Sequence, residues 1–169
     1  KALKGKYCIS KVYLKLSKIP KVNISYGAIE DTLQKMGVLK PTPKDVSNAV
    51  IEIRSSKLPD PKILNNSGSF FKNPEIDRTM FENLQNKHPN IVFYSLPDNR
   101  VKIPAGWLIE QCGWKGKQIG NVGCHAKQAL VLINYGGASG QELLDHAKKV
   151  ADSVKEKFGI TLSPEVNVY

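Results

Sequence analysis

Hydrophobic residues recur along this chain at spacings that predict helices and short strands. Residues 7–16 alternate apolar and polar side chains, as a strand does when one of its faces lies in solvent. Apolar positions three or four residues apart predict a helix over 26–36 that stops at Gly37. A second helix begins at Thr42, a residue that suits an N-cap, and closes before Pro59. The N-terminal part of the chain is therefore predicted to contain one strand and two helices.

The remainder of the pattern predicts short elements of both kinds. Extended segments are expected at 68–71, 91–96, 101–103, 129–133 and 161–169. Helices are expected from Ile76 to just before Pro89, over 105–112, and from Ser139 to Phe158. The last helix has the clearest signals, because Ser139 and Glu142 form a capping box at its start and Gly159 stops it.

Two prolines divide the chain into two parts. Pro59 and Pro61 cannot continue the preceding helix, and a linker is expected there. We therefore place the boundary between residues 1–56 and residues 57–169. The second part mixes strands and helices, has no internal repeat, and is predicted to be an α+β domain with a returning C-terminal strand.

The charge of the chain raises the question of an anionic partner. The net charge is +10 and the pI is near 9.5. The lysines are scattered, however, and the densest basic stretch, residues 1–21, interleaves them with apolar side chains. A solvated sheet face explains that stretch better than a nucleic-acid surface. A basic, non-catalytic module that binds nucleic acid or protein remains the alternative.

Cysteines, histidines and apolar runs argue against several classes of protein. Cys8, Cys112 and Cys124 are odd in number and lack CxxC spacing, so we expect three buried thiols in a reducing cytoplasm. No histidine has a companion at metal-ligand spacing, and His146 is expected at the helix surface, so no metal is predicted. No apolar run approaches the roughly 20 residues that span a bilayer, and the N-terminal residues lack the apolar segment of a signal peptide.

The stretch from Gly68 to Pro74, with the sequence GSFFKNP, carries the strongest chemical signal. It places the Ser69 hydroxyl between a glycine and two aromatic residues, and then supplies Lys72 and the Asn73 amide. This arrangement suits an anionic ligand held against a proton donor. Alone, the serine is better explained as a small residue in a turn.

Four further motifs accompany this stretch in a fixed order. They are KLPDPK at 57–62, AGWLIEQC at 105–112, QALVLIN at 128–134 and PEV at 164–166. Together the five motifs resemble the UDP-N-acetylenolpyruvoylglucosamine reductase family over nearly the whole chain. The segment that carries Tyr26 is similar to an insertion of the type I subgroup.

The resemblance implies an oxidoreductase of peptidoglycan biosynthesis in the cytoplasm. The family reduces UDP-N-acetylglucosamine-enolpyruvate to UDP-N-acetylmuramate, with NADPH as the reductant and FAD as the bound flavin. By motif match, Ser69 protonates the substrate carbon, and Glu165 meets the substrate carboxylate. Without the resemblance, Glu165 would be taken for a surface acid on an edge strand.

The resemblance also implies binding residues. Lys57 and Asn73 match residues that hold the diphosphate, and Tyr26 matches a tyrosine of a mobile loop that closes over the uridine. Lys115 and Gln128 are similar to further substrate contacts. Arg54 would face the flavin in an intact enzyme.

Members of the family are roughly twice as long and carry a preceding flavin-binding region with a catalytic arginine. This chain shows no glycine-rich phosphate loop after a strand, neither GxGxxG nor GxxxxGK[ST]. Residues 1–56 are therefore expected to belong to the flavin-binding side, and the chain alone is expected to be inactive and without bound FAD. Whether it is cut from a longer protein or complete is left open at this point.

Overall fold

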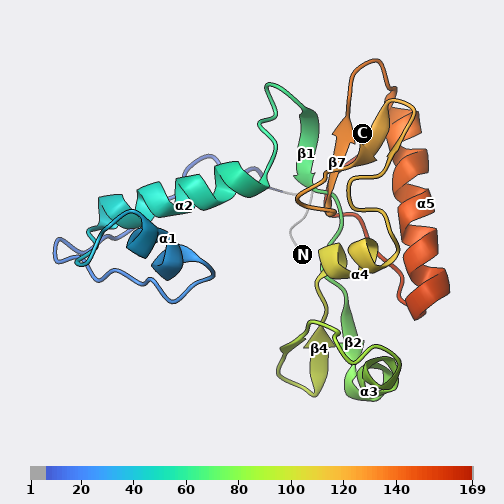
Figure 1. Cartoon of the computed structure of the whole chain (residues 1–169), viewed down its shortest axis with the longest axis horizontal. Coiled ribbons are helices and arrows are strands. Elements are labelled where there is room, and N and C mark those ends of the chain that lie inside the picture. The colour runs from blue at the N-terminus through green and yellow to red at the C-terminus, as the bar shows by residue number, and fades with distance from the viewer. Residues whose placement is uncertain (1–6, 169) are drawn as a thin grey trace. The chain divides into compact units, whose positions relative to one another are not determined.

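A computed structural model describes residues 7–168 of the chain (Figure 1). The chain divides into two compact units, one up to Ile53 and one from Arg54 onward. Helix α2 (Pro43–Lys57) runs across this division. The mixture of helices and antiparallel sheets confirms the predicted α+β class.

The first unit is built on α1 (Ile29–Lys35) and the start of α2. Thr42 caps α2 reciprocally with Asp45. The Asp45 N–H donates to Thr42 Oγ1 at 3.3 Å, and the Thr42 N–H donates to Asp45 Oδ2 at 2.8 Å. Gly37 follows α1 with φ +72°, a conformation that most side chains avoid. Both helices confirm the predicted pattern, although α1 begins later than expected.

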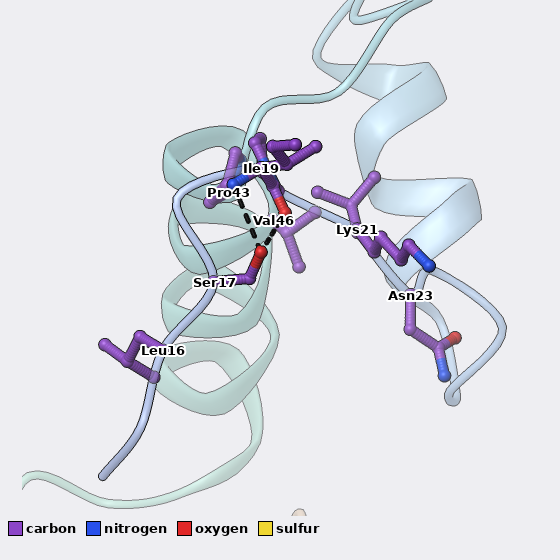
Figure 2. A pocket seen from close by; sticks show the side chains of 9 residues that line it. Leu16, Ser17, Ile19, Lys21, Asn23, Pro43 and Val46 are labelled. Atoms are coloured by element: carbon purple, nitrogen blue, oxygen red, sulfur yellow. Dashed lines mark hydrogen bonds between the residues drawn. The ribbon is translucent and has the colours of Figure 1, made fainter.

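The core of the first unit is small. Three residues are buried in it, namely Ile29, Leu33 and Ala49, and five residues of α2 or the loops are partly buried against them. Beside this core, the chain before α1 folds over the start of α2 and leaves an apolar hollow of about 500 Å³ (Figure 2). Ser17 turns the chain there, because its hydroxyl donates to the Ile19 carbonyl and accepts from the Ile19 N–H.

The strand predicted at 7–16 is wrong. These residues form no strand, and their large apolar side chains are exposed, with Tyr13 87% and Leu14 76% accessible. Alternation predicts only which face a strand would bury, whereas a strand also needs a partner to bond its backbone. Residues 7–16 pair with no strand of the described chain. Cys8, expected to be buried, is exposed for the same reason, and residues 1–6 lie outside the described part.

The second unit contains two antiparallel sheets. The larger sheet has the order β1 (Asn65–Ser69), β7 (Val131–Asn134), β6 (Val122–Cys124) and β5 (Gln118–Ile119). The smaller has the order β2 (Glu75–Asp77), β4 (Arg100–Lys102) and β3 (Tyr94–Ser95), with α3 (Arg78–Lys87) beside it. The hairpin turn between β3 and β4 places Asp98 and Asn99 at positive φ, as tight hairpin turns commonly require.

One helix packs on the larger sheet, and a second packs on that helix. Helix α5 (Gly140–Phe158) packs against β6 and β7, and α4 (Ala105–Gln111) packs against α5 (Figure 1). Strand β7 is buried along Val131 to Ile133 and lies largely within the extended segment predicted at 129–133. The capping box of Ser139 and Glu142 is present, and Gly159 ends α5 at φ +70°.

Three predictions in this unit need correction. The helix predicted from Ile76 begins only at Arg78, because Asp77 is its N-cap, and Ile76 lies in β2. The strand predicted at 161–169 is reduced to a single bridge between Phe71 and Pro164, and Tyr169 lies outside the described residues. His146 is buried, with 2% of its surface accessible, although the helical pattern placed it off the apolar stripe.

Candidate active site

The candidate site is built around the end of β1. Ser69 is the last residue of this strand and lies opposite Val131 of β7, after an irregularity in the register that begins at Asn66. Asn66 stabilises the irregularity, since its Oδ1 accepts from the Gly68 N–H at 3.0 Å. Gly68 has φ +74°, so the glycine permits the chain to turn immediately before the serine. The Ser69 side chain is exposed.

The residues that follow Ser69 are held on both sides by backbone hydrogen bonds. On one side the Phe70 N–H donates to the Leu130 carbonyl at 2.9 Å. On the other side the Glu165 N–H donates to the Phe70 carbonyl at 2.8 Å, and the Lys72 N–H donates to the Ser163 carbonyl at 2.9 Å. The fold thereby brings Ser69 and Glu165 onto neighbouring segments, one position apart in register, with both side chains exposed.

Asn73 and Gln128 meet the first turn of α4. The Ala105 N–H donates to Asn73 Oδ1 at 2.9 Å, so this side chain supplies an acceptor for the start of the helix. The Oε1 atom of Gln128 lies over Gly106, only 3.1 Å from where a Cβ atom would stand. The Gln128 carbonyl accepts from the Val131 N–H at the start of β7. Helix α4 thus links two predicted site residues from distant parts of the sequence.

The other predicted site residues are not brought into these contacts. The ammonium group of Lys115, beyond the end of α4, pairs with the Glu110 carboxylate at 2.8 Å. Arg54 and Lys57 occupy the exposed last turn of α2. Tyr26 belongs to the first unit, precedes α1, and is 82% exposed.

Sequence reasoning missed the contribution of α4 to the site. Ala105 and Gly106 belong to the motif at 105–112, which predicts a short helix but does not indicate which side chains that helix contacts. A glycine inside a seven-residue helix was the available signal, because glycine weakens helices and needs a reason to be there. Neither the bond to Asn73 nor the contact with Gln128 leaves a local trace in the sequence.

The structure also contains a strand, a turn with two glycines and a helix in succession, although their sequence lacks the spacing of either phosphate-loop motif. Strand β7 leads through Gly136 and Gly137 into α5. A cofactor phosphate would need the free N–H groups of that helix end. The Glu142 carboxylate already accepts from the Ser139 N–H at 2.7 Å and from the Ser139 hydroxyl at 2.9 Å. These two bonds lower the pKa of Glu142. The turn therefore does not fit the diphosphate of FAD, and we assign this chain no step through the flavin.

A buried histidine and a buried thiol meet where α5 packs against β6. His146 Nε2 is 3.8 Å from Cys124 Sγ, and the edge of Trp114 meets the imidazole ring. Burial lowers the pKa of His146, with Lys149 and Lys117 acting in the same direction, and raises the pKa of Cys124 to about 12. Both groups are therefore held neutral, and they act as core residues.

Two kinds of feature are absent from residues 7–168. Within this range no group of three or more His, Cys, Asp or Glu side chains is placed to hold a metal ion. Within the same described range no helix is long and apolar enough to cross a membrane.

The larger sheet, helices α4 and α5 and the Ser69 segment fall within a known domain class. A family model described as the C-terminal domain of UDP-N-acetylenolpyruvoylglucosamine reductase matches residues 60–169. The chain belongs to the UDP-N-acetylenolpyruvoylglucosamine reductase family, which confirms the resemblance drawn from the motifs.

Relatives of the same name match almost the entire chain. The Flavobacterium johnsoniae protein is 54% identical over 98% of this chain and 50% of its own length. The Pseudomonas savastanoi protein is 47% identical over 98% of this chain and 49% of its own length. The Chromobacterium violaceum protein is 48% identical over 95% of this chain and 47% of its own length. The chain thus spans about half the length of the curated relatives it matches.

Proposed function

We propose that this chain provides the substrate side of the reduction of UDP-N-acetylglucosamine-enolpyruvate to UDP-N-acetylmuramate, a cytoplasmic step of peptidoglycan biosynthesis. The observation that carries the proposal is the backbone pairing of the Ser69 segment with the Glu165 segment. The family's reaction takes its hydride from NADPH through FAD. We propose that residues 1–56, including Tyr26, belong to the flavin-binding side and residues 57–169 to the substrate domain.

Ser69 acts as the proton donor in this proposal. When hydride adds to the methylene carbon, negative charge builds on the adjacent carbon and its carboxylate. A hydroxyl within hydrogen-bond reach, about 3 Å, can protonate so basic a carbon. Glu165, on the neighbouring segment, meets the carboxylate and stabilises the developing charge by a hydrogen bond when it is protonated.

The binding residues contribute charge and amide groups. Lys57 places a point charge at the diphosphate. Asn73 offers its Nδ2 donor to the ligand, while its Oδ1 accepts from the Ala105 N–H. Gln128 offers its carboxamide beside α4, and Lys115 offers a charge that is shared with Glu110. Tyr26 closes over the uridine, and Arg54 faces the flavin.

A binding measurement on the 169-residue chain tests the substrate assignment. UDP titrated into the chain should shift amide NMR signals near Lys57 and Asn73, and Lys57→Ala should weaken the affinity. Lys62→Ala removes a nearby exposed lysine that has no assigned role and should leave the affinity unchanged. Equal affinities for parent and Lys57→Ala would refute the diphosphate site. Binding to duplex DNA that weakens steeply with salt would instead support a basic nucleic-acid module.

A chimera tests the chemistry. In the Flavobacterium johnsoniae relative, this chain would replace the matching residues. Ser69→Ala should slow NADPH oxidation driven by the enolpyruvyl sugar by about 10²–10⁴-fold, the usual contribution of a positioned proton donor. Reduction of ferricyanide by the same variant should stay near normal, because that reaction needs no protonated carbon. Ser67→Ala, a change at another exposed serine of β1, is the matched control. Full activity of Ser69→Ala would return Ser69 to the role of a turn residue.

A further inference from the structure

The first turn of α4 contains a glycine that the helix itself does not require. Gly106 lies inside α4, and its φ is not in the left-handed region. Alanine is a better helix former than glycine at such a position, because glycine gives up more backbone freedom on folding. The reason for a glycine must therefore lie outside the helix.

The space above Gly106 is taken by Gln128. A Cβ atom at residue 106 would stand 3.1 Å from Gln128 Oε1, closer than an ordinary van der Waals contact, and 3.8 Å from the Leu130 Cβ atom, which is an ordinary distance. The crowding therefore falls on the end of one flexible side chain. An alanine could be accommodated if the Gln128 carboxamide moved, so the fold would survive while the carboxamide changed its place.

The same turn holds Asn73, whose Oδ1 accepts from the Ala105 N–H. Two amide side chains, one from the segment after Ser69 and one from the segment before β7, thus take their positions from adjacent residues of α4. We propose that Gly106 is a positioning residue for ligand binding, because its missing side chain sets where the Gln128 carboxamide lies. This inference rests on the proposed function, in which Gln128 contacts the UDP-sugar.

The proposal predicts an unusual pair of effects for Gly106→Ala. The thermal midpoint of the chain should stay the same or rise, because alanine favours the helix. The affinity for UDP should fall by about 3–10-fold, the size expected when one neutral hydrogen bond is misplaced. If Gly106 served only to pack the helix, any loss of affinity in Gly106→Ala would be accompanied by a loss of stability.

A double-mutant cycle assigns the effect to Gln128. Gln128→Ala should weaken UDP binding by a similar factor, and Gly106→Ala added to it should weaken binding no further. Gly140→Ala is the matched control, because Gly140 also begins a helix at ordinary φ but has nothing within 4 Å of a built Cβ atom. That control should keep the parent affinity. A loss of affinity by Gly106→Ala in the Gln128→Ala background would overturn the proposal.

The proposal and the proposed function can fail separately. Binding of UDP by the parent with unchanged affinity in Gly106→Ala would overturn the positioning role alone. Absence of UDP binding by the parent would overturn the proposed function for this chain. In that event, the NMR signals of the Gln128 side-chain amide test whether Gly106 sets the position of this side chain. Signals that move in Gly106→Ala but not in Gly140→Ala support it, and unmoved signals overturn it.

Discussion

The two units of this chain differ in how far they bury their hydrophobic residues. From Arg54 onward, side chains such as Phe81, Leu108 and Leu132 are buried in one continuous core. Before Ile53, many large apolar side chains are exposed, namely Tyr7, Ile9, Val12, Tyr13, Leu14, Leu16, Ile19, Val22, Tyr26, Met36, Leu39 and Ile51. The comparison teaches that apolar residues stabilise a fold only where the chain itself covers them.

The largest expected effect comes from replacing a buried leucine of the second unit by alanine and comparing it with an exposed leucine of the first unit. Leu132→Ala, at a site only 1% exposed, should lower the free energy of unfolding by about 2–5 kcal/mol, since it removes buried methyl groups and leaves a cavity. Leu14→Ala, at a site 76% exposed, should change it by less than about 0.5 kcal/mol. Urea unfolding followed by tryptophan fluorescence measures the effect of Leu132→Ala, and urea unfolding followed by circular dichroism measures the effect of Leu14→Ala. Similar losses for the two variants would remove the contrast between the units.

A second substitution tests whether the first unit unfolds independently of the second unit. Leu33→Ala should destabilise the first unit by about 2 kcal/mol, near the low end for buried leucines because few neighbours surround it. Both tryptophans, Trp107 and Trp114, lie in the second unit, so their fluorescence reports on that unit alone. Circular dichroism should therefore show an earlier loss of helix while the fluorescence midpoint stays in place. Coincident shifts by both probes would mean that the units unfold together.

A third test uses pH, because all three histidines lie in the second unit. Burial lowers the pKa of folded His146 below 6.5, so the unfolded chain binds this proton more readily. The stability of the second unit should be fully present above about pH 6.5 and should fall as the pH drops toward the folded value, by at most about 1.4 kcal/mol per pH unit. His146→Leu should flatten this dependence. His125, whose pKa is also lowered, contributes in the same direction, and His125→Gln measures its share.

The smallest expected changes in the free energy of unfolding come from removing the N-caps of the two helices α2 and α5. Thr42→Ala removes the cap of α2, and Ser139→Ala removes the cap of α5, each at a cost of about 1 kcal/mol. Thr42→Ala should move mainly the circular dichroism transition, and Ser139→Ala the fluorescence transition. An unchanged fluorescence midpoint in Ser139→Ala would show that the long helix does not depend on its capping box.

The elements that the sequence predicts correctly are those whose signals are local. Thr42, Ser139, Gly37 and Gly159 act on neighbouring backbone groups, so the limits of their helices follow from a few consecutive residues. The predicted strand at 7–16 is wrong because pairing depends on a partner elsewhere, and alternation alone cannot supply it.

The site shows the same division between local and distant information. The motifs mark Ser69, Asn73, Gln128 and Glu165 as candidates, and the backbone pairing of Phe70 with Glu165 agrees with placing two of them on neighbouring segments. The burial of His146 could not be predicted from its helix, because Trp114 and Cys124, which cover it, come from the loop after α4 and from β6. The roles of the four candidate residues in catalysis and binding stay predictions until the variants above are measured.

The pairing of residues 70–72 with residues 163–165 has a consequence for the order of events during translation. Phe70 and Lys72 leave the ribosome long before their partners Glu165 and Ser163, with the whole of α5 synthesised in between. A nascent chain that stalled within α5 would already display Ser69 but would lack both the acid and the segment that clamps its neighbours. Vectorial synthesis therefore makes the proposed site one of the last features of the domain to mature.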